Sequence, residues 1–170
     1  AFSSYGFLCW LSDLTVWAKG IHAILKPGGR FAAMEFHPFA MCFDQDWEPV
    51  YDYGGGNPIR EDDGVSDYVG LSGDALAPSG FAGGEQRFRN PHPSHEFYHG
   101  LGETVNALLG AGFALQRLTE YPYSNGWEPF AGMRPGGGEH ARRRHPPAAW
   151  KGRPFPRLPL MFALEAKKLN

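Results

Sequence analysis

The side chains best suited to moving a proton are Glu35 and His37, which stand two residues apart. A carboxylate and an imidazole can each accept a proton from a reacting group, and histidine does so near neutral pH. Glu35 lies near the end of an apolar run that begins at Phe31 and is typical of a buried strand, and His37 follows that run. Ligands of open α/β sheets bind outside the carboxyl ends of the strands, so we expect these residues and Pro38 beside a site. The alternative is that His37 is a surface residue whose hydrogen bonds are satisfied.

A second polar segment occupies an equivalent place earlier in the chain. Ser3, Ser4, Tyr5 and Gly6 follow what we interpret as the tail of a strand, and Trp10 lies just beyond them. The carboxyl ends of neighbouring parallel strands meet at one edge of a sheet, so this loop is predicted to lie beside His37. The alternative is that the serines only cap a turn.

A helix and a tight turn connect these two strand ends. Asp13 is a good N-cap. The apolar positions that follow it lie on one stripe of a helix: Leu14, Trp17, Ile21, Ile24 and Leu25. Pro27, Gly28 and Gly29 then end the helix and turn the chain into the apolar run, which we expect to be a parallel strand covered on both faces.

The same order of elements recurs later in the chain. A helix is predicted from Leu101 to Ala111, and its apolar face is formed by Leu101, Val105, Leu108 and Leu109. Gly112 is predicted to adopt a left-handed conformation after that helix. A strand over Phe113–Tyr121 follows, and alternating residues in Leu158–Leu169 predict a final strand with one more exposed end.

Two long stretches show little periodicity. We interpret residues 39–97 as an insertion that forms a lid over the site, the alternative being a loosely ordered loop. Residues 123–157 are predicted to be irregular, and their arginine run 142–144 is expected to be a solvated loop rather than a nucleic-acid surface. The spacing of His92, His95 and His99 does not predict a metal site, because prolines interrupt it.

Composition narrows the class of protein. The 170 residues suit a single domain, 1–170, and the net charge of −2 gives no general attraction for nucleic acid. Two widely spaced cysteines and the lack of a run of about 20 apolar residues predict a cytoplasmic protein that does not span a membrane. The chain does not begin with methionine, so we expect an upstream part. The sequence does not indicate an oligomeric state.

Three segments together resemble class I S-adenosylmethionine-dependent methyltransferases. They are S-S-Y-G-F-L-C-W-L-S-D-L from Ser3, L-K-P-G-G-R-F from Leu25, and E-F-H-P from Glu35. Weaker similarity continues at H-G-L-G-E from His99, at E-Y-P-Y-S-N-G-W from Glu120 and in the closing strand. The resemblance implies a Rossmann-like α/β fold, truncated, with a mostly parallel sheet whose last strand is antiparallel and inserts between the strand after Pro27 and the strand 113–121.

The resemblance also implies roles for individual residues. S-adenosylmethionine would be the cofactor, bound by Ser3, Ser4, Tyr5, Gly6, Trp10 and Leu11. A small-molecule acceptor would contact Pro38, Tyr98, His99, Tyr123 and Trp127. His37 or Glu35 would act as a general base where the acceptor must lose a proton.

The family's glycine-rich loop and its ribose-binding acidic residue have no counterpart here, so the chain resembles the carboxyl-terminal half of such an enzyme and is expected to be inactive alone. A non-catalytic binding or assembly module completed by another chain is the main alternative. A nicotinamide-dependent oxidoreductase is less favoured because no G-x-G-x-x-G motif is present.

Overall fold

The computed structural model describes residues 1–54, 56–62, 64–65 and 90–169. The chain divides into two compact units, of which the first joins 1–57 with 97–170 and the second is 58–96. The second unit contains an antiparallel pair, β3 (Ile59–Glu61) and β4 (Ser94–Glu96). Its boundary falls inside the expected insertion, so residues 39–57 belong to the first unit.

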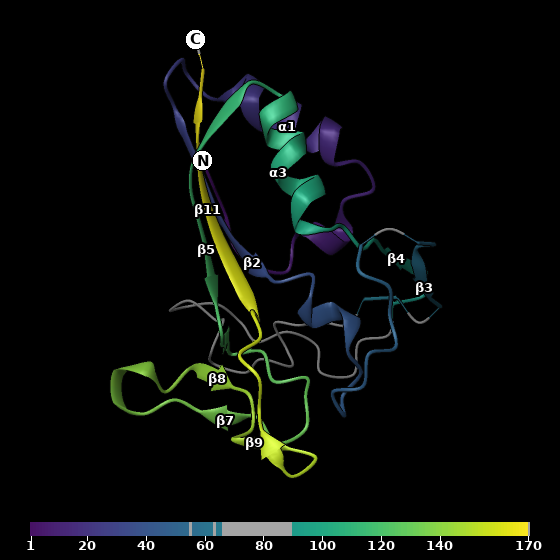
Figure 1. Cartoon of the computed structure of the whole chain (residues 1–170). Coiled ribbons are helices and arrows are strands. Elements are labelled where there is room, and N and C mark those ends of the chain that lie inside the picture. Colours follow the sequence, from purple (N-terminus) through teal and green to yellow (C-terminus); the bar gives the residue numbers. More distant parts are fainter. Residues whose placement is uncertain (55, 63, 66–89, 170) are drawn as a thin grey trace, which may run out of the picture. The chain divides into compact units, whose positions relative to one another are not determined.

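The first unit contains a four-stranded sheet with the order β1-β2-β11-β5 (Figure 1). Its strands are β1 (Phe2–Ser3), β2 (Arg30–Phe36), β5 (Phe113–Tyr121) and β11 (Met161–Lys168). β1 pairs with β2 in parallel, whereas β11 runs antiparallel to both β2 and β5. The predicted insertion of the last strand between these two strands is therefore confirmed. The Lys168 ammonium also donates to the carbonyls of His22 and Leu25, at 2.8 Å each, and ties β11 to the end of the first helix.

Two helices, α1 (Leu14–Ile24) and α3 (Leu101–Gly110), pack against one face of this sheet (Figure 1). The predicted N-cap is confirmed, because Asp13 Oδ1 accepts hydrogen bonds from two amides of the first turn, at 2.7 and 3.0 Å. Gly112 follows α3 with a φ of +95°, also as predicted. The main core forms between helices and sheet, with these buried members: Leu8, Leu14, Ala18, Phe31, Ala33, Leu108, Phe113, Phe162, Leu164 and Ala166.

The apolar face of each helix differs from the prediction at one position. Ile24 is 76% exposed, and Ala18 takes the buried place on α1. On α3, Leu109 is 47% exposed and Thr104 takes the buried place. The Thr104 hydroxyl donates a hydrogen bond to the Gly100 carbonyl at 3.2 Å. In both cases the exposed apolar side chain lies at the margin of the apolar stripe of its helix.

Only one face of β2 is deeply buried. Phe31, Ala33 and Glu35 lie on the helix-covered face and are at most 3% exposed, whereas Met34 and Phe36 on the other face are half-buried. Among the residues that the structure describes, the helix-covered face of β2 is therefore buried more completely than the other face, which Tyr5 and Trp127 cover in part through Phe36.

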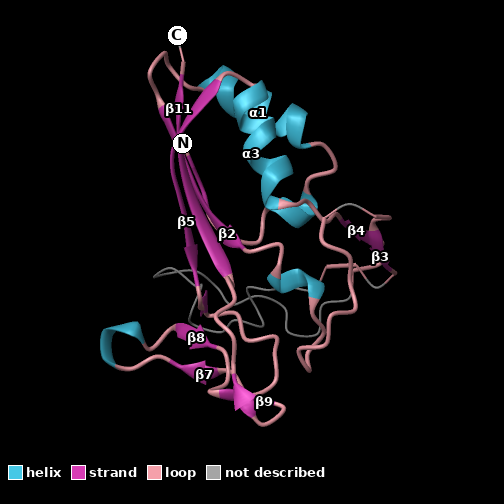
Figure 2. Cartoon of the chain, in the orientation of Figure 1, coloured by secondary structure: helices cyan, strands magenta, loops and turns pink. Residues whose placement is uncertain are grey.

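A second core forms where we expected irregular chain. Its buried members are Ala40, Trp47, Phe130, Met133 and Leu160. Around it lie a three-stranded sheet of β6 (Ser124–Asn125), β8 (Arg143–His145) and β7 (Arg134–Pro135), and the pair β9 (Ala149–Trp150) and β10 (Arg153–Pro154). Short 3₁₀ helices occur at Leu8–Trp10, Ala40–Cys42 and Gly138–His140, and loops make up much of the remainder (Figure 2).

Candidate functional site

Glu35 holds the loop that follows β1. Its carboxylate is 3% exposed, and Oε1 accepts hydrogen bonds from the amides of Gly6 and Phe36, at 2.6 Å each. Oε2 accepts from the amides of Phe7 and Leu8, at 2.8 and 3.1 Å. Charge-assisted bonds of this kind are among the stronger hydrogen bonds in proteins. Four backbone donors therefore occupy both oxygens of the side chain.

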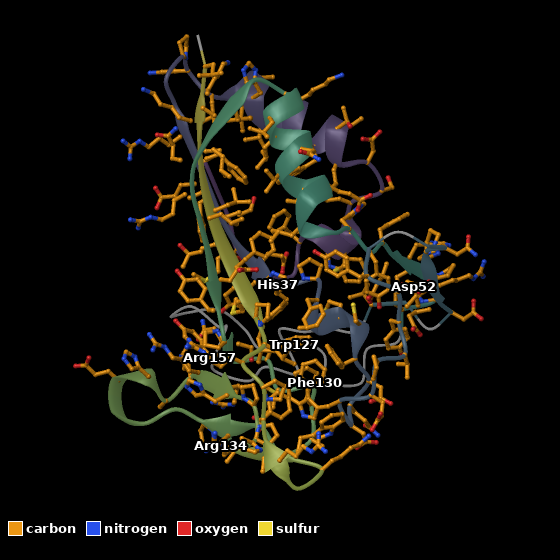
Figure 3. All side chains as sticks on the ribbon, in the orientation of Figure 1. His37, Asp52, Trp127, Phe130, Arg134 and Arg157 are labelled. Carbon is orange, nitrogen blue, oxygen red and sulfur yellow. The ribbon has the colours of Figure 1, made fainter. Side chains whose placement is uncertain are left out.

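His37 is buried and makes a hydrogen bond through each ring nitrogen. Its Nδ1 accepts from the Phe39 amide at 3.1 Å, so in the neutral ring Nε2 carries the proton and donates to Glu120 Oε1 at 2.8 Å. Burial lowers the pKa of His37, and the half-exposed Glu120 carboxylate opposes that shift only in part. The contact joins the end of β2 to β5 across β11, at the place labelled in Figure 3.

The loop after β1 exposes aromatic rings beside this anchor. Tyr5 and Trp10 are each 38% exposed, and the Tyr5 hydroxyl accepts from the Asn125 amide nitrogen at 3.0 Å. Leu11 packs on the main core, and its carbonyl lies 2.6 Å from His99 Nε2. The loop is thus fixed at both ends while its aromatic side chains remain accessible.

A row of aromatic rings leads from this loop to a cavity. The ring centroids of Tyr5 and Phe36 are 5.3 Å apart, and those of Phe36 and Trp127 are 4.4 Å apart. The Trp127 ring in turn packs against Phe130, with a centroid distance of 5.6 Å. The structure therefore brings together one predicted cofactor residue, Tyr5, and one predicted substrate residue, Trp127, through Phe36.

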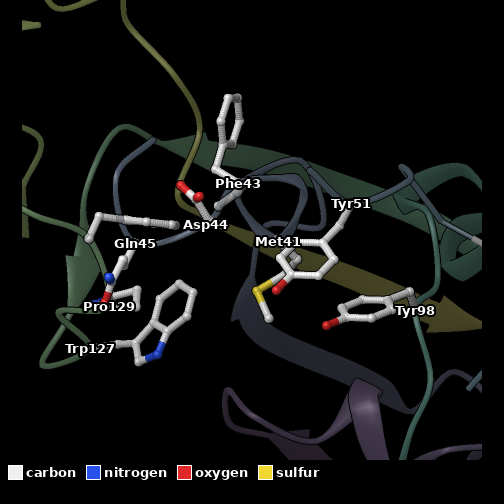
Figure 4. Close-up of a pocket in the computed structure, with 10 residues that line it drawn as sticks. Met41, Phe43, Asp44, Gln45, Tyr51, Tyr98, Trp127 and Pro129 are labelled. Carbon is white, nitrogen blue, oxygen red and sulfur yellow. The ribbon is translucent and has the colours of Figure 1, made fainter. Parts of the chain in front are cut away.

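The cavity has a volume of about 440 Å³ and is largely aromatic (Figure 4). We call it the aromatic pocket, and its lining residues are Ala40, Met41, Phe43, Asp44, Gln45, Tyr51, Tyr98, Trp127, Pro129 and Phe130. Tyr98 and Trp127 were predicted to bind substrate. Sequence reasoning missed Met41, Asp44 and Tyr51, although the density of aromatic residues after Pro38 was the available signal.

The other three predicted substrate residues, Pro38, His99 and Tyr123, do not line this pocket. His99 lines a second cavity, of about 420 Å³, near the first turn of α1. Tyr123 packs against His145, and the Arg143 guanidinium lies over its ring at 4.4 Å. The Pro38 carbonyl accepts from the Met41 amide at 3.2 Å. The structure therefore does not gather all five predicted residues around one cavity.

Two absences hold for the residues that the structure describes. Within them, no group of three or more histidine, cysteine, aspartate or glutamate side chains is arranged to hold a metal ion. No helix among them has the length and apolar character needed to cross a membrane.

Comparison with known proteins identifies the fold. No protein-family model and no curated protein matches the chain. Among solved structures, an S-adenosylmethionine-dependent methyltransferase from Mesorhizobium loti is 17% identical, with a TM-score of 0.51. A proposed methyltransferase of the same kind from Listeria monocytogenes is 15% identical, also with a TM-score of 0.51. Each match covers 99% of this chain but only 60% of the other protein. The chain therefore has the fold of class I S-adenosylmethionine-dependent methyltransferases and spans 60% of the length of these two structures.

Proposed function

We propose that this chain takes part in S-adenosylmethionine-dependent methyl transfer to a small-molecule acceptor, as the carboxyl-terminal part of such an enzyme. The observation that carries the proposal is the sheet, in which β11 lies antiparallel between β2 and β5. The structural similarity to methyltransferases supports it. Two loops at the carboxyl ends of β1 and β2 stand where ligands of such sheets bind.

The loop after β1 fits one wall of a cofactor site. S-adenosylmethionine supplies a methyl group on a positively charged sulfur. The accessible rings of Tyr5 and Trp10 can attract such a cation by about 0.5–2 kcal/mol, depending on how far water is excluded. Backbone atoms of Ser3 and Ser4 would hold the amino-acid portion. The Gly6 amide is already bonded to Glu35, so Gly6 would shape the loop rather than bind directly.

Glu35 and His37 support this site by positioning it. Glu35 already accepts four amide hydrogen bonds, and protonating it would remove acceptors from buried donors. His37 has both ring nitrogens engaged. We therefore assign both residues to holding the strand ends, in place of the general-base role that the sequence suggested.

The alternative of a non-catalytic module has one observation in its favour, which is the 60% coverage of the similar structures. Calorimetric titration of S-adenosylmethionine separates the two functions. It is done on this chain and on a chain extended through the upstream reading frame. We expect binding by the extended chain, with weak or no binding by the shorter one. Binding by neither would overturn the methyltransferase assignment and favour the module.

A further inference from the structure

We propose that the aromatic pocket binds an organic cation, such as an alkylammonium group. Its role as the acceptor site rests on the proposed methyltransferase function, but the binding itself does not. Three properties of the pocket carry the inference: aromatic faces, a carboxylate, and a rigid wall.

The aromatic faces come from three separate segments of the first unit. Tyr51, Tyr98 and Trp127 line the cavity together with the sulfur-containing side chain of Met41 (Figure 4). The faces of aromatic rings carry negative potential and attract cations, and sites that bind quaternary ammonium groups are commonly enclosed by several rings. A volume of about 440 Å³ is within the range of small-molecule pockets.

The charge of the pocket favours a cation over an anion. Among the described residues that line it, Asp44 is the one that carries a charge. Its Oδ1 accepts from the amides of Asp46 and Glu48, at 2.9 Å each, and this turn holds the carboxylate at the pocket wall. Asp46 and Asp52 add negative charge nearby in the chain, whereas Glu48 is paired with Lys151.

The wall is held in place before any ligand binds. The Trp127 ring packs against the Phe36 ring in a tilted arrangement, with ring centroids 4.4 Å apart, and the Trp127 carbonyl accepts a hydrogen bond from the buried Ser124 hydroxyl. The amide of Ala131 donates to the Gln45 carbonyl at 2.6 Å, which joins the two loops that form the pocket. A preformed pocket loses little conformational entropy on binding, so more of the cation–π attraction remains as affinity.

The test uses choline as the probe and its uncharged isostere 3,3-dimethyl-1-butanol as the comparison, both titrated by calorimetry into this chain. We expect choline to bind at least about tenfold more tightly than the neutral compound, since shape is matched and only charge differs. Equal binding of the two compounds, or no binding of choline, would overturn the proposal.

Four variants assign the binding to this pocket. Tyr51→Leu should weaken choline binding about 3- to 10-fold, whereas Tyr51→Phe should keep most of it because the ring remains. Asp44→Asn should weaken it about 5- to 30-fold while its side-chain oxygen still accepts from the turn. Asp46→Asn is the matched control, since that carboxylate is exposed and does not line the pocket. An Asp46 effect as large as the Asp44 effect would contradict the inference.

The methyl donor is itself an organic cation through its sulfonium, so a final experiment asks whether the aromatic pocket binds the acceptor rather than the donor. It repeats the choline titration on the extended chain with S-adenosylhomocysteine saturating. Retained choline affinity supports a separate acceptor pocket, and competition would overturn that role. Failure of S-adenosylmethionine to bind, with choline binding intact, would reject the proposed function and leave the cation site standing.

Discussion

The two cores of the first unit are built in different ways. The main core lies between α1, α3 and one face of the sheet, and its members recur with helical or strand periodicity. The second core has Trp47 near its centre and draws most of its residues from loops. The centroid of the Trp47 ring lies 4.1 Å from that of Phe130 and 4.6 Å from that of Phe155. The Trp47 indole nitrogen also donates a hydrogen bond to the Ala131 carbonyl at 3.0 Å. Regular elements thus support the sheet, whereas clustered aromatic rings support the loops that form the pocket.

The largest expected effect comes from removing the centre of the second core. Trp47→Ala should lower the free energy of unfolding by about 3–5 kcal/mol, because a large buried ring and its hydrogen bond are both lost. Urea denaturation measures the loss. Hydrogen exchange should rise in 121–157 and stay slow in the β2–β11 ladder. The exposed Val50→Ala is the control, and a loss for Trp47→Ala within 1 kcal/mol of that control would contradict the second core.

In the main core, the corresponding test compares substitutions of two neighbouring leucines of α3. Leu108 is 1% exposed and Leu109 is 47% exposed. Leu108→Ala should cost about 2–4 kcal/mol, and Leu109→Ala less than about 0.5 kcal/mol. Thermal or urea unfolding measures both. Similar losses for the two variants would mean that α3 packs through the face predicted from sequence.

A smaller effect is expected at the contact that ties the site to the main core. Glu35→Gln replaces one acceptor oxygen with an amide group that points at backbone donors, so it should cost about 1–3 kcal/mol. Glu120→Gln is the control, because its remaining oxygen can still accept from His37. Denaturation at pH 7 measures the two losses. Equal losses would argue against Glu35 as the residue that holds the loop.

The smallest effect is a pH dependence that arises from His37. Its folded-state pKa lies below the usual 6.5, so the unfolded chain binds more protons between those two values. The stabilisation is therefore complete above about pH 6.5 and is lost as the pH falls toward the folded-state pKa. His37→Asn keeps an acceptor for the Phe39 amide and should flatten this part of the stability curve. An unchanged slope in the variant would show that other groups cause it.

Sequence reasoning predicted the regular part of the molecule well. Asp13, Gly112 and the alternation in the last strand each act locally, so their signals survive without knowledge of the fold. Ile24 and Leu109 misled the prediction because both lie at the margin of an apolar stripe. Which side of an apolar stripe is buried depends on the shape of the surface against which the helix packs, and the helix sequence alone does not specify that surface.

The site was predicted less completely. The sequence shows that aromatic residues are frequent after Pro38, but it does not show that Trp47 belongs to a core and Tyr51 to a pocket. That difference depends on distant residues: Trp47 bonds to Ala131, and Tyr51 lines the pocket together with Trp127. Glu35 carried the signal of a proton-transfer residue, and the structure surrounds it with backbone amides from residues 27–29 positions earlier. Long-range partners decide whether a carboxylate is free or occupied, and periodicity does not report them.

The most direct test of the central claim is to crosslink methyl-labelled S-adenosylmethionine to the extended chain with ultraviolet light and map the labelled peptide. We expect label in the tryptic peptide that carries Ser3, Tyr5 and Trp10 and ends at Lys19, with loss of label when excess S-adenosylhomocysteine is added. Label confined to other peptides of this chain, or label that does not compete, would contradict the placement of the cofactor beside the loop held by Glu35.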